Sequence, residues 1–116
     1  MTFTLNIGTD RNGKPSNAFK TEQEVFAWAY GNGLEVVSQR WAQSEPIGEW
    51  PAELILVVKL SGMIPLGQVA RLCSITDQHA IAVYDHSRLS GQLVWSDDLP
   101  EDIERFPFNA EYFHEA

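Results

Sequence analysis

The longest continuous apolar run sets the strongest limit on how this chain folds. Leu54 to Val58 are all aliphatic, and together with Glu53, Lys59 and Leu60 they form a segment of strand length. A half-buried strand would alternate apolar with polar residues, whereas a strand buried on both faces reads as continuously apolar. We therefore predict that 53–60 forms a central strand buried on both faces.

The other strands and two helices are predicted from shorter periodic patterns. Thr21 followed by Glu24 is a capping-box signature that places a helix start at Thr21, and Gly31-Asn32-Gly33 ends that helix. Pro65 suits the first turn of a second helix, in which Leu66, Val69, Ala70 and Cys73 recur at helical spacing. Alternation or β-propensity predicts further strands at 3–7, 34–41, 80–84 and 92–95, and 100–105 is expected to form a short helix.

The order strand–helix–strand–strand–helix–strand–strand predicts an α+β domain over residues 1–116. Two similar strand–helix–strand halves favour a ferredoxin-like core, in which two helices cover one face of an antiparallel sheet. An extra C-terminal strand and a short acidic helix or tail would follow. The alternative is a different α+β sandwich with the fifth strand at an edge.

The charge of the chain limits its partners. Sixteen Asp and Glu against eight Lys and Arg give a formal net charge of −8. Nucleic acid and anionic membranes are disfavoured, because both attract Lys and Arg. We expect a protein partner, and the negative charge favours a basic one; a small uncharged ligand and a homodimer remain open. The N-terminus has no pattern of a signal peptide, so we expect a cytoplasmic protein.

No residue pattern in the sequence predicts catalysis, a metal site or a cofactor. Cys73 is the single cysteine and lies on an apolar helix face, as a buried structural cysteine would. His79 and His86 bracket one strand, too far apart to share a metal ion. Gly31 and Gly33 follow a helix rather than precede one, which argues against a phosphate loop.

The C-terminal acids provide the main candidate for a functional surface. Seven of the last twenty residues are acidic, and Trp95 precedes them. Acidic groups beside a large aromatic residue are suited to a basic protein surface, where carboxylates imitate phosphate charge. The simpler interpretation is a solvated surface, with Asp98 capping the helix predicted from Pro100. The predicted contact residues are Trp95, Asp97, Asp98, Glu101, Asp102 and Glu104.

A small-ligand protein or enzyme is the alternative function. Ferredoxin-like sheets can enclose a pocket between sheet and helices, and its expected lining residues are Trp41, Tyr84, Asp85 and His86. Trp50 and the aromatic residues of 106–113 either form an exposed patch or cover the open face of the sheet. A third option is a structural subunit that assembles through its edge strand.

Four short segments carry a resemblance to a known group of proteins: Thr4–Gly8, Ser44–Pro46, Ala80–Tyr84 and Phe108–Phe113. Together they are similar to small acidic α+β proteins encoded on proteobacterial prophages, plasmids and other mobile elements. That resemblance implies an accessory protein acting on a host protein, without assigning an activity to any residue. The segment from Pro46 to Pro51 is longer than the resemblance implies.

Overall fold

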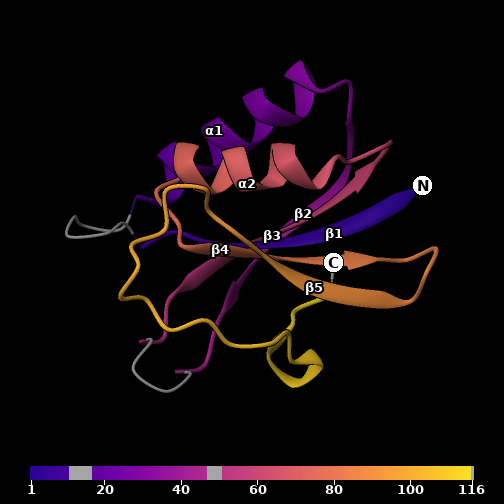
Figure 1. Cartoon of the computed structure of the whole chain (residues 1–116). Helices are drawn as coiled ribbons and strands as arrows, with labels where there is room; N and C mark the ends of the chain where they lie inside the picture. The colour runs from indigo at the N-terminus through magenta and orange to yellow at the C-terminus, as the bar shows by residue number, and fades with distance from the viewer. Residues whose placement is uncertain (11–16, 47–50, 116) are drawn as a thin grey trace.

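The computed structural model describes residues 1–10, 17–46 and 51–115, which form an antiparallel sheet and two α-helices. Both helices lie on one face of the sheet, and the C-terminal chain crosses the other face (Figure 1). The α+β class is thereby confirmed. The elements are β1 (Thr2–Gly8), α1 (Ala18–Gly31), β2 (Glu35–Gln43), β3 (Leu54–Ser61), α2 (Leu66–Ile75), β4 (Ala80–Asp85), β5 (Ser90–Trp95) and the 3-10 turn η1 (Ala110–Tyr112).

The five strands are arranged in the order β2-β3-β1-β4-β5, and every neighbouring pair is antiparallel. The N-terminal strand β1 is therefore the middle strand. The predicted strand 53–60 corresponds to β3, whose residues Ile55–Val58 are buried, as its continuous apolar sequence indicated. The predicted fifth strand is present as β5, at the edge beside β4.

The main core fills the space between the helices and one face of the sheet. Alternate residues of β1, including Leu5 and Ile7, contribute to it, and so do Leu56 and Val58 from β3. The helices supply Val25, Trp28, Val69 and Leu72. The indole Nε1 of Trp28 donates to the backbone oxygen of Gln68 at 3.0 Å, which connects α1 to α2. Because strand side chains alternate, the residues between these face the opposite side.

The first helix begins earlier than its sequence signature predicts. Asn17 is the N-cap, and its side chain accepts a hydrogen bond from the backbone N–H of Lys20. Thr21 is fully buried inside α1, so the capping-box prediction at Thr21 and Glu24 is wrong. An Asn at the N-cap satisfies a free helical amide as well as Thr does, and Ala18-Phe19-Lys20 extends the helix by almost one turn.

The short helix predicted at 100–105 is also absent. Residues 101–103 form turns, and the only helical turn after β5 within the described chain is η1. Asp98 therefore does not cap a helix; its carboxylate accepts a hydrogen bond from the hydroxyl of Ser74 at 2.9 Å. A Pro-containing stretch with few apolar residues offers little surface for a helix to bury, so local turns replace it.

The outer strand β2 is unusually open to solvent. All of its residues are exposed except the half-buried Ala42, and its pairing with β3 shifts register between Val36 and Ser38. A bulge of this kind bends and twists an edge strand, which discourages pairing with another chain.

Among the described residues, no helix is long and apolar enough to cross a bilayer.

Candidate functional site

The open face of the sheet is covered by residues 106–115, which we call the C-terminal segment. Phe113 lies over β4, with its ring centroid 5.8 Å from that of Tyr84, and Phe108 lies 5.6 Å from Phe113. Phe106 meets Trp95 edge to face at 5.5 Å. Of the two interpretations of the aromatic residues in 106–113, the structure supports a cover over the sheet. Trp50 lies outside the described residues.

Hydrogen bonds between side chains of the sheet and the backbone of the C-terminal segment fix the end of that segment. The carboxamide of Asn6 donates to the backbone oxygen of His114 and accepts from its N–H, each at 2.8 Å. Asn6 is only 8% exposed, so this reciprocal pair is shielded from water. The guanidinium of Arg40 on β2 donates to the backbone oxygen of Glu115. The segment thus spans the sheet from β5 to β2.

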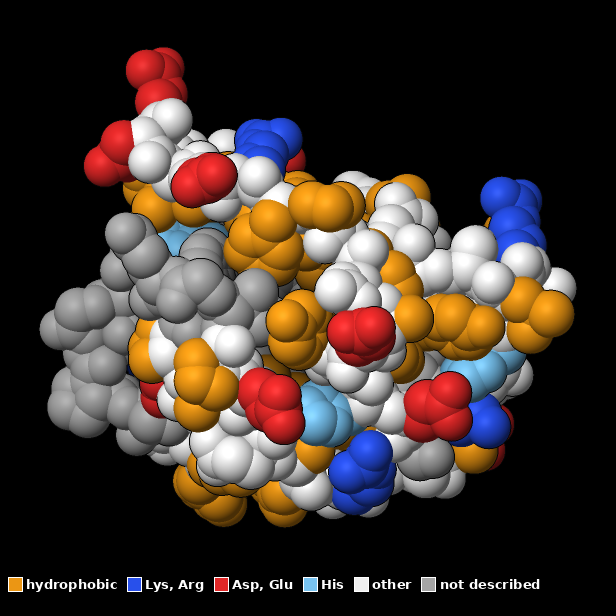
Figure 2. All heavy atoms as spheres, turned by 90° about the horizontal axis from the view of Figure 1, so that it is seen from below, with side chains coloured by type: hydrophobic (Ala, Val, Ile, Leu, Met, Phe, Trp, Pro, Cys, Tyr) orange, Lys and Arg blue, Asp and Glu red, His pale blue; other side chains and the backbone are white. Residues whose placement is uncertain are grey.

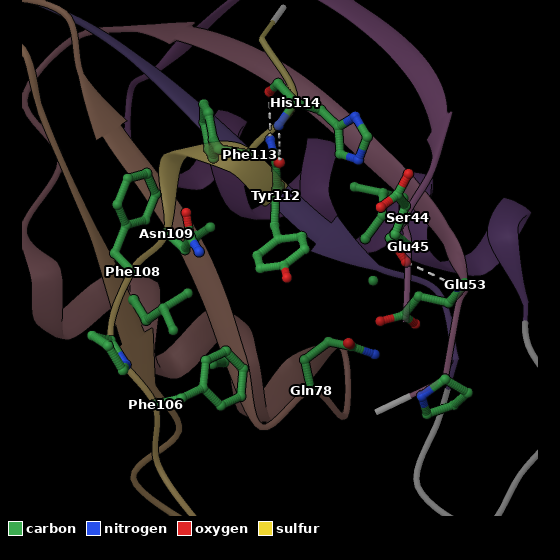
Figure 3. Close-up of a pocket in the computed structure, with 18 residues that line it drawn as sticks. Ser44, Glu45, Glu53, Gln78, Phe106, Phe108, Asn109, Tyr112, Phe113 and His114 are labelled. Carbon is green, nitrogen blue, oxygen red and sulfur yellow. Dashed lines mark hydrogen bonds between the residues drawn. The ribbon is translucent and has the colours of Figure 1, made fainter. Parts of the chain in front are cut away.

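A cavity of ≈ 290 Å³ lies between the C-terminal segment and the sheet (Figure 3). Its floor is built from open-face positions with small side chains, Gly8, Ala80 and Ala82, together with Ile55 and Leu93. Small residues on the floor leave space that the aromatic rings above do not fill. The wall formed by the C-terminal segment consists of Phe106, Pro107, Phe108, Asn109, Tyr112, Phe113 and His114.

One end of the cavity is polar. Glu53, just before β3, and Gln78, just before β4, point toward each other there (Figure 3). Both side chains lie against Gly8, where an added Cβ would clash with the Gln78 carboxamide and the Glu53 carboxyl. The Glu53 carboxyl accepts the backbone N–H of Asp10 at 3.0 Å, and the Gln78 carboxamide donates to the Asp10 oxygen. The glycine and these hydrogen bonds hold both groups at the cavity.

The half-buried position of Glu53 changes its acidity. Burial raises its pKa from 4.5 to about 7, and the nearby Asp10 charge acts in the same direction. Backbone hydrogen bonds from Asp10 and Thr9 oppose the shift without cancelling it. A carboxyl group with a pKa near neutrality changes charge in the physiological range, which is a recurrent property of functional sites.

The pKa of His114 is lowered, whereas that of Glu53 is raised. Burial and the neighbouring positive charge of Arg40 lower its pKa below the ordinary value of 6.5, although the negative charge of Glu45 opposes them. The imidazole is therefore mostly neutral at pH 7. The described lining includes two carboxyl groups, Glu45 and Glu53, and neither lysine nor arginine.

The predicted acidic contact residues lie away from this cavity. Trp95 is half-buried, with the Arg105 guanidinium 5.7 Å from its ring centroid. Viewed from the side of the C-terminal segment, hydrophobic side chains cover much of the surface and acidic side chains lie among them (Figure 2). All of the acidic contact residues are exposed: Asp97, Asp98, Glu101, Asp102 and Glu104.

The structure does not bring the four residues of the predicted alternative pocket together. Trp41 is on β2, separated from β4 by β3 and β1. Tyr84 and His86 do meet, with ring centroids 5.2 Å apart, and the His86 Nε2 is 2.7 Å from the Thr4 hydroxyl. The Asp85 carboxylate instead accepts the N–H groups of Ser87 and Arg88. Tyr84 and Asp85 are neighbours on β4 and point to opposite faces, and two strands, β3 and β1, separate Trp41 from them.

A second cavity on the helix side does not rescue that prediction. It measures ≈ 370 Å³ and is lined by Phe3, Pro65, Asp85 and Arg88 among others, but by neither Trp41, Tyr84 nor His86. The cavity with the aromatic lining lies on the opposite face of the sheet, under the C-terminal segment. The prediction of a pocket between sheet and helices with those four residues is therefore wrong.

Sequence reasoning missed the residues that line the polar end of the cavity. Glu53 was assigned to a strand end and Gln78 to no role. The one local signal is the small–large alternation of Ala80-Ile81-Ala82, which places small side chains on a single face of β4. No such signal marks Glu53, because its environment depends on Gly8 and Gln78 from distant parts of the chain.

The fold and the cavity define an α+β protein with helices on one face of its sheet and an aromatic-lined cavity on the other. Within residues 1–10, 17–46 and 51–115, no group of three or more His, Cys, Asp and Glu side chains is placed to hold a metal ion. Neither the protein-family models, nor the curated proteins, nor the solved structures contain a match to this chain.

Proposed function

We propose that this protein binds a small organic molecule in the cavity between its sheet and its C-terminal segment. The observation that carries this proposal is the cavity itself, ≈ 290 Å³ in volume, with an apolar floor, aromatic walls and one polar end. This composition is typical of ligand sites, and its volume is at the small end of their range. It corresponds to the ligand-binding alternative drawn from the sequence, at a different place in the fold.

A fragment screen followed by NMR tests this proposal. We expect binders to shift the methyl signals of Ala82 and Leu93, which line the cavity, and to raise the melting temperature of the protein. Ala82→Leu adds side-chain volume to the floor and should abolish both effects. Ala27→Leu makes the same change at an exposed position on α1 and should leave them intact.

The melting temperature of each variant without ligand establishes that it folds. A chemically broad library that shifts neither methyl signal in the unmodified protein would contradict the proposal. Binders that shift these signals equally in the Ala82→Leu variant would place the site elsewhere.

We also infer that the first four strands and two helices are a ferredoxin-like core to which β5 is added. The support is the order β4-β1-β3-β2 within the sheet, with β5 outside β4. Each helix connects two strands that are not neighbours in the sheet: α1 leads from β1 to β2, and α2 from β3 to β4. This connectivity supports a split strand–helix–strand arrangement.

The acidic surface supports a second candidate function, a module that binds a basic protein. Its support is the exposure of the carboxylates of 97–104, while the adjacent Arg105 lies over Trp95. In the mobile-element setting that the resemblance implies, the partner would be a host protein that normally binds nucleic acid. Carboxylates that imitate phosphate charge would then compete for its basic groove.

Charge reversal tests this second function. The variant replaces four acidic residues by lysine: Asp97, Asp98, Glu101 and Asp102. It should bind a captured basic partner more than about tenfold more weakly at low salt, because steering and rim contacts are electrostatic. Lys at Glu22 and Glu35, which lie outside 97–104, is the control. Equal affinity for both sets of variants, or binding insensitive to salt, would exclude the acidic surface as the contact.

A further inference from the structure

The charged side chains in the described lining of the cavity are carboxyl groups. Glu53 and Glu45 supply carboxyl groups, whereas the described lining has no lysine or arginine. The charge of Asp10, after β1, acts on Glu53, and the uncharged Gln78 lies beside it before β4. Two further titratable groups line the same cavity, Glu45 after β2 and His114 from the C-terminal segment. Burial and the charge of Arg40 lower the pKa of His114, so its imidazole is mostly neutral near pH 7.

The rest of the cavity is apolar and aromatic. Phe106, Phe108 and Phe113 form one side, and Ile55 and Leu93 form part of the floor. A ligand that fits both parts must carry a polar group at one end of an apolar body. Among the residues that the structure describes, an anionic group at the polar end would meet carboxyl groups and neutral side chains, at a strong electrostatic cost.

We propose that the natural ligand is an organic ammonium ion whose apolar body lies among these aromatic rings and whose charged nitrogen pairs with Glu53. This inference rests on the proposed ligand-binding function and adds the chemical class of the ligand. The oxygen of Gln78 provides a second acceptor beside the ammonium, because both groups converge over Gly8. Aromatic faces next to a cation add a further attraction.

The pairing has a consequence for pH dependence. Glu53 must lose its proton to form the ion pair, and its pKa in the free protein is about 7. An amine with a pKa near that of lysine stays charged from pH 6 to pH 8, so only the protein titrates. The ionised fraction of Glu53 rises about tenfold over that interval, and the affinity for the amine should rise by the same factor.

The test compares three probes that share one carbon skeleton: 3-phenylpropylamine, 3-phenylpropan-1-ol and 3-phenylpropanoate. Each is titrated at pH 6 and pH 8 while the methyl signals of Ala82 and Leu93 are followed by NMR. We expect the amine to bind most tightly at pH 8, about tenfold more weakly at pH 6, and the carboxylate to bind least. The alcohol should bind with little dependence on pH.

Glu53→Gln separates the ion pair from the shape of the cavity. In this variant the amine should lose its advantage over the alcohol and its pH dependence, while the alcohol still shifts both methyl signals. Glu45→Gln is the matched control, because Glu45 is an exposed carboxyl at the same cavity and should change the amine affinity much less.

The outcomes distinguish this inference from the function on which it rests. If the alcohol or the carboxylate binds as tightly as the amine, or if Glu53→Gln leaves the pH dependence unchanged, the ammonium assignment is overturned and ligand binding stands. If the amine produces no shift at millimolar concentration, the assignment is likewise overturned. The fragment screen then decides independently whether the cavity binds any small molecule.

Discussion

Replacement of Phe113 by Ala is expected to detach the C-terminal segment and to lower the free energy of unfolding by about 2 kcal/mol. The ring of Phe113 contacts both Tyr84 and Phe108, so its loss removes the centre of the aromatic cover. Truncation of a fully buried Phe costs more, but Phe113 is half-buried. The cavity loses one wall, and the affinity of any ligand found there should fall by more than about tenfold.

Urea unfolding and amide hydrogen exchange measure these effects separately. The N–H of His114 donates to the Asn6 side chain, so its exchange should accelerate strongly once the segment is released. Phe19→Ala is the matched control: Phe19 is 71% exposed on α1, and its loss should change stability by less than about 0.5 kcal/mol. Equal stability of the two variants, with slow exchange at His114, would show that Phe113 does not hold the segment.

Replacement of Glu53 by Gln is expected to raise the free energy of unfolding at pH 8 by about 2 kcal/mol, with no gain at pH 4. The pKa of Glu53 is about 7 in the folded protein, against 4.5 for an unperturbed carboxyl. Below pH 4.5 the group is neutral whether the chain is folded or not. Between 4.5 and 7 the unfolded chain ionises first, so stability decreases as pH rises through this window.

Above pH 7 the folded protein carries the cost of a partly buried carboxylate, which Gln avoids. Some contact with solvent screens this cost, so the expected value lies below the full conversion of the pKa difference. Urea unfolding of both proteins from pH 4 to pH 8 gives the difference directly. The exposed Glu101→Gln is the control. If the difference in unfolding free energy between Glu53→Gln and the unmodified protein stayed constant from pH 4 to pH 8, the burial of Glu53 would be contradicted.

The sequence predicted elements whose patterns are local and regular. The apolar run of β3 identified a strand buried on both faces, and Pro65 marked the start of α2. What covers the second face of β3 was not predictable from that run. The cover is the C-terminal segment, whose aromatic residues follow neither helical nor strand periodicity because turns and Pro107 interrupt them.

The two errors in predicted helices, the start of α1 and the absent helix at 100–105, have a common cause. Thr21 and Asn17 both have side chains that can cap a helix, and the choice depends on whether Ala18-Phe19-Lys20 gains by joining α1. At 100–105, acidic residues after a proline satisfied the local criteria for a helix start, yet there was no apolar face to dock. Tertiary packing decides both cases, and sequence patterns alone do not contain it.

The candidate site was the least predictable part. Its polar end combines Gly8, Glu53 and Gln78, which meet only because β1 lies beside both β3 and β4. Asn6 and His114 are 108 residues apart in sequence, so their reciprocal hydrogen bonds had no local signature. The exposed acids of 97–104 were predicted as a surface, and their solvent exposure agrees with that interpretation.

The central position of β1 also has a consequence for how fast the protein folds. Two pairs of strands, β2 with β3 and β4 with β5, are close in sequence and can pair early. The first strand of the chain must then insert between them, with Leu5 pairing across to Val58 and Val83. Such distant pairings require large loops to close before any contact is gained. We therefore expect folding in milliseconds to seconds rather than microseconds, with insertion of β1 as the slow step.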